Sequence, residues 1–415
     1  MRQFKTPIWI FVLVLALTGF GLLMVYSSSA VVAAAHVNHV RSDQLQLGEV
    51  FRPVHHHSLY LQKQLIWLVL GLVVMMFLYA EADYNRILAR SKLLCLVAFA
   101  LLAAVYLPKI GLKINGARRW IKLGPMTFQP SEFAKLVVII ATAKMLNDRR
   151  DQLRSFGRGF LPPLALGAVF VAAIAVEDLG AAIVLAAIIA ILWFIAGIRI
   201  LHLIALGPIG LAALAVGVLI KPYRLGRIIT FARSILEGSN DLQVEVAAKA
   251  WQAKQSLIAV GTGGWTGLGP GMGIQKHYFL PAVYTDYVFA NICEELGFIG
   301  AVALLLLFAT LCFIGLRVAY KSPDFVGALL VSGLIAMIAV PALINVAVVL
   351  GCAPTKGLAL PFISYGGSSL LINLSAMGLL MNIARRNEEI QEVKRPVAVT
   401  PERRLWKWGR TENVC

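Results

Sequence analysis

The stretch "PAVYTDYVFANICEELGFIG" (residues 281–300) runs on into "AVALLLLFATLCF" (residues 301–313) and decides the class of the whole protein. An apolar run of this length is typical of a helix that crosses a lipid bilayer. Asp286 nevertheless stands at its mouth, and Glu294 and Glu295 lie inside it. Carboxylates are costly in a bilayer unless they are paired or face water. The stretch therefore predicts a membrane helix that begins beside a polar site.

The composition extends this interpretation to the entire chain. Of the 415 residues, 59% are hydrophobic and 14% are charged, which is more apolar surface than one soluble core could bury. A membrane barrel would show short alternating strands, whereas the apolar runs here are solid. We count ten runs that approach the roughly 20 residues a bilayer crossing requires. They are Ile8–Ser27, Gln64–Ala80, Leu93–Leu107, Phe133–Leu146, Phe160–Val176, Leu179–Ala196, Leu201–Ile220, Tyr287–Gly315, Phe325–Leu350 and Ser368–Ile383.

The fold class that we expect is an all-α integral membrane protein with ten transmembrane helices. Because Lys and Arg gather in cytoplasmic loops, the basic connections place both termini in the cytoplasm. Residues 1–384 then form the membrane domain, with a large external loop at 221–285 between the seventh and eighth helices, and residues 385–415 form a cytoplasmic tail. The first run resembles a secretory signal but lacks a convincing cleavage site, so we expect it to be retained.

The formal net charge of +17 does not indicate nucleic-acid binding. Many basic residues fall on the predicted cytoplasmic side, where anionic lipid heads attract them. The sequence has no zinc-finger spacing and no basic helix with base-reading residues. The five cysteines form no disulfide or metal pattern. Three consecutive histidines, His55–His57, favour a solvated loop over a metal site, because neighbours in a regular element cannot all face one ion.

A basic external segment, "PKIGLKINGARRWIKLGPMTFQPSEFAK" (residues 108–135), departs from the usual charge distribution of membrane proteins. External connections normally hold few basic residues, so either the charge is tolerated or it serves an anionic ligand at the outer membrane surface. We favour the ligand because five cations fall within 14 residues. They are Lys109, Lys113, Arg118, Arg119 and Lys122.

The end of this segment, "FQPSEFAKL" (residues 128–136), predicts the start of a helix, with Ser131 as its cap. Glu132 and Lys135 stand three residues apart on one face of that helix. In a membrane they must neutralise each other or face water and substrate, and both arrangements stay open. A second helix start, "EDLGAAIVL" (residues 177–185), carries Asp178 as a cap at the outer surface.

The large external loop contains an amphipathic segment, residues 247–260, that predicts a helix at the membrane surface. It continues into "GTGGWTGLGPGMGIQK" (residues 261–276), which holds seven glycines. Such glycines allow the backbone to approach a ligand closely, and their N–H groups can bind phosphate oxygens. A flexible loop is the alternative; Gln275 and Lys276 favour a pyrophosphate site. The spacing of a nucleotide-binding loop is missing, so we expect no nucleotide.

A fourth motif, "APTKGLALPFISYGGSSLLINL" (residues 353–374), lies at the last external junction. It combines Lys356 with prolines and glycines that break a helix. Irregular backbone at membrane depth is tolerated where it lines a water-filled cavity. Ser364 and Ser368 are therefore candidate ligands in a re-entrant structure.

These motifs together closely resemble the SEDS family (shape, elongation, division and sporulation). The resemblance extends from the first apolar run to the last, and "PTKGLALPFISYGGSS" is more similar to the FtsW division branch than to the RodA elongation branch. It implies a peptidoglycan glycosyltransferase that polymerises lipid II on the outer face of the bacterial inner membrane, at the division septum. The implied partners are a class B penicillin-binding protein and other membrane proteins of the division complex. The chain departs from the family at Tyr284, usually His, and at Glu177, usually Pro.

The resemblance implies that Asp286 is catalytic. We expect its carboxylate to take the proton of an acceptor sugar hydroxyl, while an inverting displacement expels undecaprenyl pyrophosphate without a covalent intermediate. Mg²⁺ or Mn²⁺ on the phosphates is a candidate cofactor, and Glu294 and Glu295 line the cavity or pair internally. The expected substrate-binding residues are Arg118, Arg119, Glu132, Lys135, Gln275, Lys276, Lys356, Ser364 and Ser368.

Two other functions fit a polar cavity in a membrane protein. A lipid II flippase would also need intramembrane charges, and paired inverted repeats with a site at the midplane of the bilayer would favour it. A non-catalytic scaffold that recruits the penicillin-binding protein is the third interpretation. The polar motifs cluster at the external junctions, which favours the enzyme.

Overall fold

The computed structural model describes residues 6–38, 59–114, 117–124, 126–219, 224–226, 229, 244–277 and 283–394. The long helices are α1 (Thr6–Asn38), α2 (Leu59–Ala80), α5 (Pro130–Asp148), α6 (Leu161–Ala175), α7 (Leu179–Ile195), α8 (Ile200–Leu219), α10 (Val244–Gly263), α11 (Val288–Tyr320), α12 (Phe325–Val349) and α13 (Gly367–Lys394). The shorter elements are α3 (Tyr84–Ala89), α4 (Ser91–Ala104), β1 (Gly111–Ile114), β2 (Ala117–Leu123), β3 (Met126–Phe128), a 3₁₀ turn at Arg150–Gln152 and a π turn at Phe156–Phe160. The predicted histidine loop, His55–His57, lies outside the described residues.

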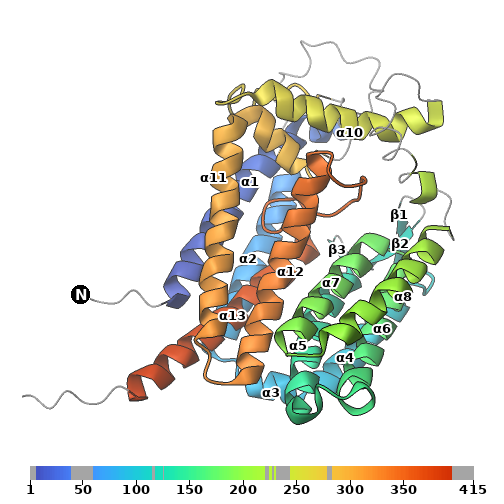
Figure 1. The fold of residues 1–415 in the computed structure, drawn as a ribbon. Helices are drawn as coiled ribbons and strands as arrows, with labels where there is room; N and C mark the ends of the chain where they lie inside the picture. The colour runs from blue at the N-terminus through green and yellow to red at the C-terminus, as the bar shows by residue number, and fades with distance from the viewer. Residues whose placement is uncertain are drawn as a thin grey trace, which may run out of the picture.

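The long helices form a bundle with two ends of different character (Figure 1). Helices α1, α2, α11, α12 and α13 pack on one side, helices α4 to α8 on the other, and α12 joins the two sides through contacts with α5 and α7. Helix α10 lies across one end of the bundle, and α3 lies at the opposite end. The Gly-rich segment after α10 and the start of α11 therefore share one end.

All ten predicted runs fall on described helices, and the mostly helical prediction is confirmed. Seven of the described helices are long and apolar enough to cross a membrane: Thr6–Ser28, Tyr60–Ala80, Phe156–Ala175, Ile200–Leu219, Val288–Tyr320, Phe325–Val349 and Gly367–Val393. Helices α4 and α7 are apolar but shorter, and α5 carries four charged residues. Helix α13 continues through Lys394, so the start of the predicted tail is helical.

The all-α expectation missed a small antiparallel sheet in the basic segment. Its strands pair in the order β1-β2-β3. The sequence does carry the signal, because Asn115-Gly116 separates two stretches of strand-forming residues, and Asn-Gly is a strong hairpin turn. Gly124, between β2 and β3, has a φ of +60°, which glycine adopts without strain. The sheet holds the cations of this segment on a rigid ribbon instead of a loose loop.

Candidate functional site

Asp286 lies two residues before helix α11, in a turn that precedes its cap, Tyr287. The residue is half-buried. A Cβ atom built on Gly357 would fall 2.8 Å from Oδ2 of Asp286, so the carboxylate lies directly against the backbone of the α12–α13 loop (residues 350–366). The structure thereby brings Asp286 beside the loop that carries Lys356, which is also half-buried.

Two sets of hydrogen bonds tie the α12–α13 loop to the segment that carries Asp286. The backbone N–H of Tyr365 donates to the carbonyl of Tyr284 at 2.8 Å. Asn345 of α12 donates through Nδ2 to the carbonyls of Asp286 at 2.8 Å and Leu358 at 2.6 Å. Asn345 was not among the residues predicted from the sequence, although an amide inside an otherwise apolar run is a usable signal of function.

The two predicted serines of this motif are both buried, and Ser364 stabilises the loop. The Ser364 hydroxyl is buried and accepts a hydrogen bond from the N–H of Leu360 at 2.8 Å. Nearby Phe362 has a φ of +64°, an uncommon left-handed conformation for a bulky residue. Ser368 is buried at the start of α13. Contact between these serines and a substrate stays a prediction.

Three tyrosines gather beside Asp286. The ring centroid of Tyr60 lies 5.0 Å from that of Tyr284 and 5.2 Å from that of Tyr365. Burial, followed by the neighbouring tyrosines and Asp286, raises the pKa of the Tyr284 hydroxyl well above its usual value. Tyr284 therefore stays protonated at physiological pH, so the residue that replaces the family's usual histidine can donate a hydrogen bond but cannot act as a base.

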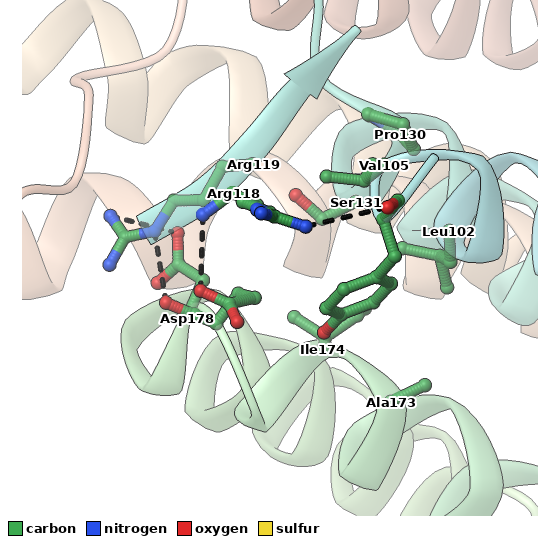
Figure 2. Close-up of a pocket in the computed structure, with 11 residues that line it drawn as sticks. Leu102, Val105, Arg118, Arg119, Pro130, Ser131, Ala173, Ile174 and Asp178 are labelled. Atoms are coloured by element: carbon green, nitrogen blue, oxygen red, sulfur yellow. Dashed lines mark hydrogen bonds and ion pairs between the residues drawn. The ribbon is translucent and has the colours of Figure 1, made fainter. Parts of the chain in front are cut away.

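A small hollow lies between the end of α4, β2, the start of α5 and the α6–α7 junction (Figure 2). Arg119 extends from β2, and its guanidinium lies 3.5 Å from the Asp178 carboxylate and donates to the carbonyl of Glu177 at 3.0 Å. The backbone N–H of Arg118 donates to the Glu177 carboxylate at 3.1 Å. The lining residues are Leu102, Val105, Tyr106, Arg118, Arg119, Pro130, Ser131, Ala173, Ile174, Glu177 and Asp178.

Asp178, which lines the hollow, stands at the start of α7. Asp178 caps this helix as predicted, because its Oδ1 accepts a hydrogen bond from the N–H of Ala181 at 3.0 Å. A Cβ atom built on Gly180 would lie 3.3 Å from Oδ1 of Asp178 and 3.6 Å from Cδ2 of Leu358. Leu358 directly follows Gly357, which touches Asp286. Leu358 thus lies between the start of α7, which borders the hollow, and the loop backbone that Asp286 contacts.

Glu132 and Lys135 form the ion pair that their spacing allows. Their charged atoms are 2.9 Å apart, and both residues are buried in the first turns of α5. The prediction that Ser131 caps this helix is wrong. The cap position belongs to Gln129, because Pro130 occupies the first turn, where its fixed φ and missing N–H are well tolerated. Contact between the pair and a substrate stays a prediction.

The Gly-rich loop (residues 261–277) explains the two glutamates inside α11. The helix leaves helical geometry at Gly297, with φ 65° and ψ −166°. This break exposes backbone carbonyls, and the N–H groups of Leu268 and Gly269 donate to those of Glu294 and Glu295, both at 3.0 Å. A Cβ atom on Gly267 would lie only 2.2 Å from the Glu295 carbonyl oxygen. The glycine thus allows close approach to α11 itself.

The side chains of both glutamates bind the same loop. Glu294 accepts hydrogen bonds from the N–H groups of Ile274 at 2.9 Å and Gln275 at 3.1 Å. Lys276 is buried, and its ammonium contacts Glu295 at 2.9 Å, Ser27 of α1 at 3.1 Å and the carbonyl of Gly271 at 2.6 Å. The prediction that Glu294 and Glu295 pair internally is confirmed for Glu295, and pyrophosphate binding by Gln275 and Lys276 stays a prediction.

Comparisons with known proteins cover almost the whole chain. A family model described as a cell cycle protein, named for FtsW, RodA and SpoVE, matches residues 8–389. Stage V sporulation protein E of Bacillus subtilis (strain 168) is 39% identical over 377 residues, 90% of this chain and 95% of that protein. The probable peptidoglycan glycosyltransferase FtsW of Trichlorobacter lovleyi is 37% identical over 373 residues, 90% of this chain and 91% of that protein.

Comparison with solved structures points to the same family. A chain from a structure described as structural coordination of polymerization and crosslinking by a peptidoglycan synthase complex is 28% identical, with a TM-score of 0.67, over 91% of this chain and 97% of that one. With its apolar helices, the present chain is a multi-pass membrane protein. It belongs to the FtsW/RodA/SpoVE family, as the SEDS motifs predicted.

Proposed function

We propose that this protein is a peptidoglycan glycosyltransferase that polymerises lipid II. One observation carries the proposal: the Asp286 carboxylate lies against Gly357 of the α12–α13 loop, and the next residue of this loop, Leu358, lies beside Gly180, two residues after Asp178 of the arginine-lined hollow. A carboxylate beside fixed cations is what a reaction needs when a hydroxyl loses its proton and a phosphate leaves. The names of the relatives, which include a peptidoglycan glycosyltransferase and a peptidoglycan synthase complex, support the same activity.

In the proposed mechanism, Asp286 accepts the proton of the 4-hydroxyl of the acceptor's N-acetylglucosamine as that oxygen attacks. The attack falls on the anomeric carbon of the donor's N-acetylmuramic acid. The bond to undecaprenyl pyrophosphate breaks in the same displacement, with inversion at that carbon. Arg118 and Arg119 face the negative charge that grows on the departing pyrophosphate. Arg119 keeps N–H donors for it, since a guanidinium has five donors and the bonds to Glu177 and Asp178 use two.

The remaining substrate contacts of the proposal come from the neighbouring motifs. Lys356 lies in the α12–α13 loop next to Gly357 and contributes positive charge close to Asp286. Pro130 and Ser131 line the hollow, and the pair of Glu132 and Lys135 comes directly after them in α5. Ser364 and Ser368 hold the loop and the start of α13 around the sugar. A divalent cation such as Mg²⁺ would depend mainly on phosphate oxygens, because the described residues contain no cluster of three ionisable metal ligands.

The proposal includes the membrane arrangement. All ten apolar helices cross the bacterial inner membrane, both termini are cytoplasmic, and the end of the bundle with α10 faces outward, where lipid II is polymerised. The partner is a class B penicillin-binding protein, which would crosslink the strands that this chain makes; coordination of polymerization with crosslinking in the similar complex supports this pairing. The FtsW and SpoVE relatives favour a role at the septum, together with other division-complex proteins.

Reconstituted vesicles test the activity against the rival flippase. The full-length protein and its partner are inserted into vesicles, and dye-labelled lipid II is supplied in the leaflet that faces the α10 end. We expect glycan polymer with no change in the leaflet distribution of unreacted lipid II. Transfer of lipid II between leaflets without polymer would establish the flippase instead. Absence of both activities from folded protein would favour the scaffold.

A further inference from the structure

Asn345 has a buried amide side chain in an apolar helix. The proposed reaction gives this amide no role. It is 2% exposed and lies near the end of α12, where Ser332 is the helix's other hydrogen-bonding side chain. A polar group in such surroundings is costly unless it is hydrogen-bonded. The bonds that Asn345 makes should therefore reveal why an amide occupies this position.

The orientation of the amide is fixed by its two partners. Both the Asp286 carbonyl at 2.8 Å and the Leu358 carbonyl at 2.6 Å are acceptors, so the atom that faces them must be the NH₂ group. The two carbonyls belong to segments about seventy residues apart, the turn before α11 and the α12–α13 loop. One side chain from a third element thus binds both segments that enclose the Asp286 carboxylate.

The other end of the amide has no partner among the described residues, so the contribution of Asn345 lies in its NH₂ group. Within the described part of the chain, Oδ1 of Asn345 is buried and has no hydrogen-bond partner. Leaving such an acceptor unsatisfied costs about 1–3 kcal/mol. An apolar side chain of similar size would avoid this cost but would leave the carbonyls of Asp286 and Leu358 without this donor, so what the amide contributes is the pair of bonds that joins the two segments.

We infer that Asn345 is a positioning residue that fixes the Asp286 carboxylate against the α12–α13 loop through its two carbonyl bonds. The inference rests on the proposed function, since it assigns Asn345 to the geometry of the Asp286 base. Without these bonds, the turn before α11 and the Gly357 backbone separate or slide, and the carboxylate moves out of reach of the acceptor hydroxyl. Small displacements of a catalytic group can cost orders of magnitude in rate.

The chain contains a matched control. Asn382 of α13 is 4% exposed, and its Nδ2 donates to the carbonyls of Tyr79 at 3.1 Å and Ala82 at 2.7 Å. This is the same double donation to two carbonyls, located beside α3 at the end of the bundle opposite α10. A substitution there removes equivalent bonds without touching the Asp286 region.

The experiment compares Asn345→Leu, Asn382→Leu and the unaltered protein, each full-length with its partner, in lipid II polymerisation normalised to folded protein. We expect Asn345→Leu to lower kcat by at least about tenfold with KM within about twofold, because chemistry and not binding is impaired. Asn382→Leu should keep kcat within about twofold. A kcat of Asn345→Leu close to that of Asn382→Leu would overturn the inference. If Asn345→Leu does not fold, Asn345→Ser, which keeps one donor, is judged by the same comparison.

A double variant separates positioning of Asp286 from a general loss of structure. If Asn345 acts through Asp286, adding Asn345→Leu to Asp286→Asn should reduce the remaining rate by less than about twofold. Multiplication of the two losses would refute the inference and leave the proposed function intact. A polymerisation rate in Asp286→Asn equal to that of the unaltered protein would instead refute the proposed function.

Discussion

The Gly-rich loop and the arginine-lined hollow lie on the external side of the proposed fold, and both contain charged residues in or beside apolar helices, yet they use these charges differently. In the Gly-rich loop, the Lys276 side chain is 4% exposed and the Glu295 side chain 1% exposed, and they neutralise each other. In the hollow, the Arg119 side chain is 25% exposed and forms part of the lining. The first region stabilises a bend in α11, and the second leaves charge accessible to a ligand.

The difference teaches how a charged residue in a membrane protein should be assessed. From the sequence alone, Lys276 and Arg119 were equally good candidates for binding pyrophosphate, because both belong to motifs that resemble the same family. Packing separates them, since three acceptors surround the Lys276 ammonium, whereas two bonds leave donors of Arg119 unused. Exposure and the number of unused donors distinguish a structural ion pair from a ligand contact.

The largest effect on stability should come from breaking the buried pair. Lys276→Met leaves Glu295 buried without its counter-charge, which typically costs about 3–5 kcal/mol. Thermal unfolding of the detergent-solubilised protein measures the loss. Lys144→Met is the matched control, because its pair with Asp148 has the same geometry at 3.0 Å but is partly exposed and should contribute less than about 1 kcal/mol. Equal losses in the two variants would contradict the assignment of Lys276 as a structural residue.

Gly357→Ala tests the contact between the loop and Asp286. The added methyl would lie 2.8 Å from Oδ2 of Asp286, so the carboxylate must move, and we expect kcat to fall by about 10- to 100-fold. Gly366→Ala is the control, because its Cβ would meet nothing closer than 3.7 Å. Steady-state polymerisation of lipid II measures both variants. An active Gly357→Ala enzyme would show that the carboxylate does not need this position.

Arg119→Lys tests whether the exposed guanidinium in the hollow binds the phosphates of lipid II. A lysine retains the charge but cannot bind Glu177 and Asp178 and still present a planar pair of donors to phosphate. We expect kcat/KM for lipid II to fall by about tenfold. Lys122→Arg, a swap on the exposed part of the same strand, should change it by less than about twofold. Comparable values for the two variants would remove Arg119 from the site.

The smallest expected effect concerns His277, at the end of the Gly-rich loop. Burial, and then the neighbouring Lys276, lowers the pKa of His277 below its usual value. The unfolded chain therefore binds a proton more readily as the pH falls below about 6.5, so folded stability should decrease on acidification in that window. Unfolding temperatures at pH 7.5 and 5.5 measure this, and His277→Gln should reduce the difference. An unchanged difference would exclude His277 as its source.

The helices and the motifs could be predicted from sequence because each depends on local pattern. Apolar runs identified the helices, and the spacing of Glu132 and Lys135 allowed the pair that the structure shows, although it left substrate contact equally open. The sheet was missed although the sequence contains the Asn115-Gly116 pair, because the apolar runs dominated the interpretation. The partners of Lys276 and Asn345 could not be predicted, since Glu295 lies beyond a loop and the carbonyls of Asp286 and Leu358 carry no side-chain signal.

The most direct test of the account is the rate of lipid II polymerisation by Asp286→Asn, which keeps the shape of the side chain and removes its basicity. General acid–base groups typically contribute about 10²- to 10⁴-fold. The account predicts a loss of kcat in that range, with KM and the unfolding temperature close to those of the unaltered protein. Polymer formed at the unaltered rate by folded Asp286→Asn protein would contradict it.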